Sequence, residues 1–236
     1  MPQIQKAADK ASAAVANLAR LMSNIKGPRA SKRKTLMSVA HLILLYGAEI
    51  WADALDVQKY QNRMVSVQRR CAMRIASSYR TVSAPAVLAV AGVAPITLLA
   101  RERKRIYNRC QTENDCSLIK TEERLQTLAE WQQQWIIDSG GRWTAGLIGE
   151  VSPWFGRRHG EVNFYLTQFL TCHGHFNSYL FRRNREESQL CDYCPGKIDD
   201  VENTFYECNR WAGNKHAIET LLGEAITPRN TVSLML

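Results

Sequence analysis

Three cysteines near the end of the chain have the spacing of a small metal-binding knuckle. Cys191 and Cys194 are separated by two residues and followed by Pro195-Gly196, a turn that presents both thiolates to one metal ion. Cys208 follows after a short polar loop. This spacing is typical of zinc sites, so we expect zinc as the cofactor.

The fourth ligand is not fixed by this pattern. A knuckle of this kind carries a histidine five residues before its last cysteine, and this chain has Asn203 there. An asparagine amide is a weak zinc ligand. By their chemistry His173 and His175 are the nearest replacements, with Cys172 and His216 as weaker alternatives. We take His173, Cys191, Cys194 and Cys208 as the candidate metal ligands.

The charge of the chain is divided unevenly along its length. The net charge is +9, but residues 1–110 contain nineteen Lys and Arg against five Asp and Glu, whereas residues 111–236 contain twelve against seventeen. A strongly basic half favours a polyanionic partner. No lipid-facing helix accompanies the charge, so we expect nucleic acid rather than a membrane.

Three groups of basic residues are the candidate nucleic-acid contacts. The first lies in the first turn of an expected helix, where the macrodipole disfavours cations unless an anion such as phosphate docks there. The other two recur at helical spacing on two later helices. Solvated basic surfaces or a nuclear-import patch are the alternative reading. The candidates are Lys32, Arg33 and Lys34, then Arg63, Arg70 and Arg74, then Arg101, Arg105 and Arg109.

Hydrophobic periodicity predicts a mainly α fold. The expected helices cover residues 4–25, 31–55, 60–75, 84–91, 95–110, 122–138 and 212–222, with two short helices between 164 and 181. The second is expected to bury Leu36, Val39, Ile43, Tyr46, Ile50 and Trp51. We predict a basic helical domain over 1–138, an irregular linker over 139–162, and a cysteine-rich module with a last helix over 163–236.

The sequence contains no recognisable catalytic motif. It has no glycine-rich phosphate loop and no nucleophile elbow, and its one Asp-Asp pair, Asp199-Asp200, lies in the polar loop of the knuckle without a preceding strand. Cys172 beside His173 is the nearest catalytic arrangement, but a buried turn or metal ligands explain it better. We therefore expect no active site within these residues.

The number of cysteines and the N-terminal sequence indicate a compartment inside the cell rather than secretion. Seven scattered cysteines do not form a secreted disulfide framework, and the first residues lack a signal-peptide pattern. We expect a nuclear or cytoplasmic protein with its cysteines reduced.

Several strings together resemble non-LTR retrotransposons, in the region that follows the reverse-transcriptase palm. The resemblance is strongest to the type-1 arthropod elements that insert into ribosomal RNA genes, and it covers about residues 6–211. The strings are Leu44–Trp51, Val67–Arg70 with Arg74-Ile75, Tyr79–Ser83, Ala91–Ile96, and the cysteine segment ending Cys208–Trp211.

The resemblance implies a thumb-like helical bundle followed by a knuckle. Intact members of the family are polyproteins with an endonuclease, a central RNA-directed DNA polymerase and a C-terminal cysteine-rich part. The implied partners are RNA, an RNA–DNA or DNA duplex, and the upstream palm. Asn203 departs from the family's histidine, as a decayed or truncated copy would. A domesticated helical protein-interaction module is the alternative function.

Overall fold

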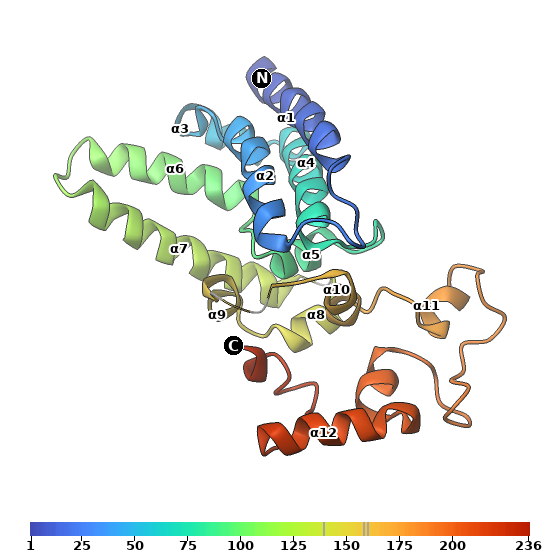
Figure 1. Cartoon of the computed structure of the whole chain (residues 1–236). Helices are drawn as coiled ribbons and strands as arrows, with labels where there is room; N and C mark the ends of the chain where they lie inside the picture. Colours follow the sequence, from blue (N-terminus) through green and yellow to red (C-terminus); the bar gives the residue numbers. More distant parts are fainter. Residues whose placement is uncertain (139, 158, 160) are drawn as a thin grey trace.

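The computed structural model describes residues 1–236 except 139, 158 and 160, all three within the predicted linker (Figure 1). The described residues form helices and turns without a named strand, and Leu190 and Ile198 form an isolated antiparallel bridge. The prediction of a mainly α fold is confirmed. The helices are α1 (Pro2–Ala19), α2 (Ala30–Leu44), α3 (Ala48–Trp51), α4 (Gln58–Ala76), α5 (Ala84–Ala91), α6 (Ile96–Cys110), α7 (Cys116–Ile137), α8 (Arg142–Leu147), α9 (Val151–Gly156), α10 (Phe164–Thr171), α11 (Asn177–Phe181) and α12 (Ala212–Leu222).

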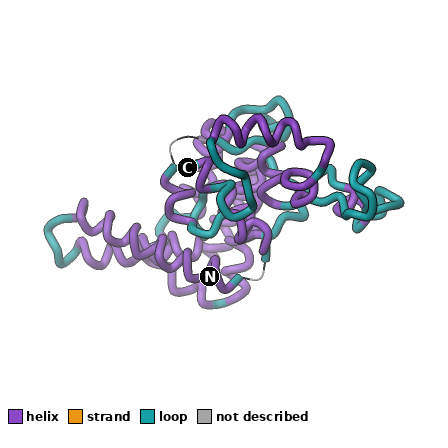
Figure 2. The backbone as a smooth tube through the Cα atoms, turned by 90° about the horizontal axis from the view of Figure 1, so that it is seen from below, coloured by secondary structure: helices purple, strands orange, loops and turns teal. Residues whose placement is uncertain are grey.

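The centre of the molecule is a bundle in which α1, α2 and α4 pack against one another and α5 packs against α4. The apolar side chains of these helices form one continuous hydrophobic core. Helices α6 and α7 pair along their length and project from the bundle, while the cysteine segment projects on the other side (Figures 1 and 2). The fold therefore has two extensions from a common core.

The second helix differs from its prediction in its length and in the side chains that it buries. It ends at Leu44, and Gly47 adopts a left-handed conformation (φ 68°) before α3 and the 3₁₀ turn η1 (Ala52–Asp56). The residues it buries are Arg33, Met37, Ala40 and Leu44. Val39, Tyr46 and Ile50, which we expected inside, are exposed by 46%, 73% and 81%. Trp51 is buried as expected, and Leu36 and Ile43 pack against the core. Apolar residues occur on several sides of this segment, so spacing alone does not decide which of them are buried.

The segment predicted to be irregular contains two helices. Tryptophans anchor this region: Trp154 Nε1 donates to the Ala89 carbonyl at 2.9 Å, and Trp135 Nε1 donates to Ile148 at 2.7 Å. Helix α9 also packs against α7. The expectation of irregular chain was wrong over α8 and α9, because these short helices tolerate Gly146 in α8 and Pro153 near the start of α9.

Two other helix ends differ from prediction. Helix α1 ends at Ala19 rather than near Ile25, although Met22 beyond it is still buried. Helix α7 begins at Cys116, six residues before the predicted start, because the Asp115 carboxylate accepts hydrogen bonds from the amides of Ser117 and Leu118 at 3.0 Å.

No single helix in the described part of the chain is both long and apolar enough to cross a bilayer. Two bent helix pairs meet the length and composition requirement only when joined: α2 with Ala48–Asp56, and α5 with α6.

Candidate functional site: a cysteine cluster and the basic helices

Cys191, Cys194 and Cys208 come together at the tip of the second extension. Their Sγ atoms all lie within 4.8 Å of one another, and those of Cys191 and Cys208 are 3.9 Å apart. Tetrahedral zinc with Zn–S bonds of about 2.3 Å separates its sulfurs by about 3.8 Å. The three thiols are at most 9% exposed. The donor set and its spacing therefore fit a thiophilic metal ion such as zinc.

Backbone geometry holds the three cysteines in place. The Cys191 amide donates to the Lys197 carbonyl at 2.9 Å, and the Lys197 amide donates to the Cys194 carbonyl at 3.0 Å, which closes the turn at Pro195-Gly196. Cys208 follows the π-helical turn η2 (Asn203–Glu207), and its amide donates to the Asn203 carbonyl at 2.7 Å. The cluster is thus built from two turns that face each other.

Asn203 is buried beside the cluster. It is 5% exposed, and neither its Oδ1 nor its Nδ2 meets an oxygen or nitrogen partner in the part of the chain described. Its amide lies against the Cys191 thiol. The Oδ1 atom still lacks a donor, and a buried carbonyl oxygen without a partner is energetically costly. A metal ion among the thiolates would supply that partner to Oδ1, so the residues present fit a fourth ligand from Asn203.

The thiols differ in their pKa values. Burial raises the pKa of Cys191, but the Tyr193 amide and the Asn203 side chain outweigh it, so this pKa lies below the usual thiol value. Burial, together with the thiols of Cys194 and Cys191, raises the pKa of Cys208. Cys191 is therefore more readily deprotonated for metal binding than Cys208.

His173 does not lie with the cysteines, which corrects its assignment as a ligand. Among the described residues the metal-competent group consists of the three cysteines alone. The His173 Nδ1 lies 2.6 Å from the Thr171 carbonyl, and its ring packs edge-on against Tyr179. Burial lowers the pKa of His173. Cys172 ends α10 in a left-handed conformation. These residues form a turn next to the core, not a second ligand group.

Asp199 and Asp200 are used in local structure. Asp199 Oδ2 accepts a hydrogen bond from the Asn177 amide at 2.8 Å, and Asp200 Oδ1 accepts one from the Asn203 amide at 2.9 Å. They connect α11 to the cysteine segment and support the turn that contains Asn203.

Arg33 is buried, contrary to its assignment as a phosphate contact. It is 2% exposed, and its guanidinium donates to the carbonyls of Pro28 (2.6 Å), Arg74 (3.0 Å) and Ser23. Burial and the neighbouring Arg74 lower its pKa. Gly27 has no side chain because a Cβ there would collide with the Ser23 carbonyl and the Arg33 guanidinium. Arg33 thus fixes the connection between α1 and α2.

The neighbours of Arg33 are placed differently. Lys34 Nζ donates to the Gly92 carbonyl at 2.9 Å and lies 5.5 Å from the centre of the Phe155 ring. Burial and Arg157 lower the pKa of Lys34. Lys32 is exposed, with no ion pair or side-chain hydrogen bond to another described residue. Of the first predicted group, only Lys32 presents its charge freely to solvent.

The arginines of α6 are paired with carboxylates. Arg105 pairs with the buried Glu123 and, at 3.3 Å, with Glu130. Arg109 pairs with Glu113 (2.8 Å), Glu122 (2.7 Å) and Glu123 (3.1 Å), which raises its pKa. Arg101 pairs with Asp56 at 2.8 Å. These cations connect helices, and that corrects the picture of a free basic face on α6.

Helix α4 retains part of its predicted basic surface. Arg63 pairs with Asp9 of α1, and Arg70 donates to the Ser12 hydroxyl at 2.7 Å. Arg74 is half-buried. Exposed cations without a carboxylate or hydrogen-bond partner among the described residues are most numerous on α1, α2, α4 and their connections, where they are Lys6, Lys10, Arg20, Lys26, Arg29, Lys32, Lys59 and Arg80. Others, such as Lys120, Arg142, Arg185 and Arg229, are scattered over the rest of the described chain.

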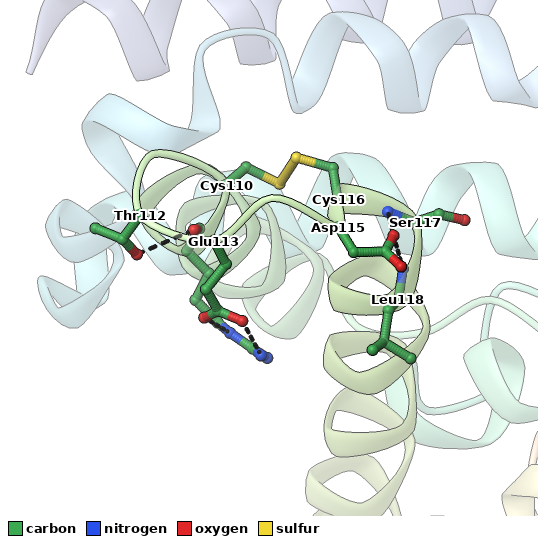
Figure 3. Close-up of a disulfide and its surroundings, with 8 residues drawn as sticks. Cys110, Thr112, Glu113, Asp115, Cys116, Ser117 and Leu118 are labelled. Carbon is green, nitrogen blue, oxygen red and sulfur yellow. Dashed lines mark hydrogen bonds and ion pairs between the residues drawn. A yellow bond between two sulfur atoms is a disulfide. The ribbon is translucent and has the colours of Figure 1, made fainter.

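The α6–α7 tip contains a disulfide that the sequence analysis did not predict. Cys110 ends α6 and Cys116 begins α7, and their sulfurs are bonded across a Cα–Cα distance of 5.4 Å (Figure 3). The same turn contains the Asp115 cap and the Glu113 carboxylate (Figure 3). This pair differs from the expectation of reduced cysteines, and the reducing nuclear or cytoplasmic location stays a prediction.

The chain is distantly homologous to Pol polyproteins of insect R1 retrotransposons. It is 26% identical over 181 residues to the Pol polyprotein from type-1 retrotransposable element R1 2 of Nasonia vitripennis, which covers 70% of this chain and 44% of the relative. A second Nasonia vitripennis R1 polyprotein is 26% identical over 204 residues (77% and 58%), and the R1 polyprotein of Bradysia coprophila is 27% identical over 180 residues (69% and 18%).

The matched segment spans less than two thirds of each of these relatives. No protein-family model matches the chain, and no solved structure is significantly similar to it. The homology therefore supports the resemblance in the sequence and does not by itself assign a role to this portion.

Proposed function

We propose that this chain is a nucleic-acid-binding portion of a retrotransposon RNA-directed DNA polymerase polyprotein, from the thumb to the cysteine knuckle. The observation that carries the proposal is the placement of the unpaired cations on the α1–α2–α4 bundle. The carboxylates Asp9, Asp53, Asp56 and Glu102 each already pair with one cation, so the remaining positive charge has no internal partner. Such a surface attracts a phosphate backbone.

In this proposal the cysteine cluster holds zinc and stabilises the knuckle. The ligands are the thiolates of Cys191, Cys194 and Cys208 with Oδ1 of Asn203. The metal would supply folding energy to a segment with few apolar contacts of its own. RNA and an RNA–DNA or DNA duplex are the partners, and an upstream palm would supply the polymerase chemistry.

The test is the salt dependence of RNA binding by the purified chain, measured by fluorescence anisotropy. Lys26→Gln, Arg29→Gln and Lys32→Gln together remove three exposed charges next to the start of α2. Each lost phosphate contact should lower the log–log salt slope by about 0.7 on single strands. Lys120→Gln with Arg229→Gln is the control, because both residues are exposed and lie outside the basic bundle.

Absence of RNA binding at low salt would overturn the proposed function. Equal salt slopes for the triple variant and wild type would show that the start of α2 is not a contact.

One feature favours the alternative of a protein-interaction module. An apolar groove of about 700 Å³ lies between α10, η2 and α12, with Phe169, Phe205, Trp211, Ile218 and Leu222 in its walls. If the chain binds no nucleic acid, this groove becomes the leading binding surface.

A further inference from the structure

The groove between α1 and α2 combines an apolar wall with a cationic wall. Its volume is about 430 Å³, within the range of ligand pockets. Helix α1 contributes Gln3, Lys6, Ala7 and Lys10, and the end of α2 with the following turn contributes Leu42, Ile43 and Tyr46. We refer to these seven residues as the α1–α2 groove.

The apolar wall is unusually exposed. Leu42 is 61% exposed and Tyr46 is 73% exposed, and Val39 extends the same face of α2 by one turn at 46%. Large apolar side chains that follow one another along a helix surface indicate a binding surface rather than scattered surface residues. Tyr46 offers a flat ring, and its hydroxyl makes no hydrogen bond to a described residue.

The cationic wall has no internal counter-charge. Lys6 and Lys10 are one helical turn apart on α1, and both are exposed without an ion pair among the described residues. The nearby carboxylate of α1, Asp9, is paired with Arg63 of α4 instead. None of the seven groove residues is acidic. The groove is therefore electrostatically complementary to an anion that lies along α1.

We propose that the α1–α2 groove binds single-stranded nucleic acid, with phosphates on Lys6 and Lys10 and an unpaired base stacked on Tyr46. Aromatic rings beside a cationic track are the usual means of binding single strands without sequence preference. An internal base pair of a duplex offers Tyr46 no free base face, because its bases are already stacked on their neighbours. The inference rests on the proposed function and adds the site and strandedness of the ligand.

The experiment uses the full chain and a fluorescein-labelled oligouridine of about 16 nucleotides. Tyr46→Leu keeps an apolar side chain but removes the ring, and it should weaken binding about tenfold. Lys6→Gln with Lys10→Gln should lower the salt slope by about 1.4. The matched controls are Tyr107→Leu, another exposed tyrosine, and Lys120→Gln with Arg229→Gln, which removes the same charge elsewhere. Circular dichroism melting checks that all variants are folded.

The outcomes separate the two proposals. Loss of affinity in the groove variants and not in the controls supports the groove. If wild type binds oligouridine and the groove variants bind equally well, the groove assignment is wrong and the proposed function stands. If wild type binds no nucleic acid, both fail. Tighter binding to the corresponding duplex, or a dimer in sedimentation that Tyr46→Leu disrupts, would assign the groove to a different occupant and overturn the inference.

Discussion

Arg33 places a permanent charge inside the helical core, and its environment allows a direct stability prediction. We expect Arg33→Met to lower the free energy of unfolding by at least about 3 kcal/mol, because three carbonyl oxygens lose their donor at about 1–3 kcal/mol each. Urea denaturation measures the change. Lys32→Met on the exposed side of the same turn is the control and should change stability little.

A loss for Arg33→Met no larger than that for Lys32→Met would mean that the three carbonyls find water in its place. The variant also bears on function. If Arg33 contacted phosphate, replacing it would change the salt slope of RNA binding, whereas a buried arginine should leave that slope unchanged in protein that remains folded.

Asn203 gives the second residue-scale prediction. We expect Asn203→His to bind zinc more tightly than wild type, because an imidazole nitrogen is a better zinc ligand than an amide oxygen. Competition with a chromogenic chelator measures the affinity. Asn203→Ala should bind more weakly than wild type if Oδ1 is the fourth ligand. Equal affinities for wild type and Asn203→Ala would show that the amide does not bind the metal.

For some single residues the spacing in the sequence predicts the position in the structure, and for others it does not. The cysteine spacing predicts the cluster of Cys191, Cys194 and Cys208, and the structure confirms it. The Pro-Gly turn restricts the first two cysteines, and a second turn, Asn203–Glu207, brings Cys208 to them. His173 was proposed for its chemistry, with no such restriction, and it lies elsewhere. Arg33 could not be predicted as buried, because its partners are backbone carbonyls of residues that no sequence pattern marks.

At the scale of elements, the α6–α7 hairpin depends on one buried carboxylate. Glu123 is 3% exposed and accepts hydrogen bonds from Arg105 and Arg109. Burial raises the pKa of Glu123, but the hydrogen bonds and charges of Arg105 and Arg109 lower it by more than burial raises it. The net pKa therefore lies below the usual value for a glutamate. The hairpin is therefore held by an ion-pair network in addition to its apolar contacts.

We expect Glu123→Gln to lower the free energy of unfolding by about 3 kcal/mol, since two arginines lose the charge of their partner in a buried setting. Thermal and urea denaturation measure the loss. Glu113→Gln is the matched control: it also removes a partner of Arg109, but the carboxylate is solvent-exposed, so no measurable change is expected. Equal effects of the two substitutions would contradict a special role for the buried position.

Helix existence was more predictable from the sequence than helix ends and faces. Helices α4, α5 and α12 agree with their predictions. Ser83 and Gly92 mark the two ends of α5, and Gly223 marks the end of α12, whereas α4 has no side-chain cap and is predicted by its apolar spacing alone. Helix α2 was wrong because Gly47 in a left-handed conformation ends the element within an apolar run. Which apolar face is buried depends on the neighbours α1 and α4, and a single helix pattern does not contain that information.

At the scale of the whole molecule, the cysteine extension is a separate cluster linked to the main core. The three thiols contact one another rather than the core, while Val201 in the same segment is fully buried within it. Hydrogen bonds from Asn177 and Ser178 to Asp199 reinforce the link. Metal binding should therefore govern the order of the extension more than the stability of the helical bundle.

Removal of metal tests this organisation in the intact chain. We expect that chelation of the zinc-loaded protein makes residues 188–211 sensitive to trypsin, with cleavage after Lys197 and Arg210. Without metal, three buried thiols and the unpartnered Oδ1 of Asn203 no longer favour the closed turn. The main thermal transition should change little, since α1, α2, α4 and α5 share a core that the cysteines do not enter. Limited proteolysis read by mass spectrometry, with circular dichroism in parallel, measures both.

Val201 joins the extension to the main core and limits how far the unfolding can spread. If Val201 stays in the core after chelation, cleavage remains within the extension. A cooperative loss of helix on chelation would instead show that the extension and the bundle fold as one unit.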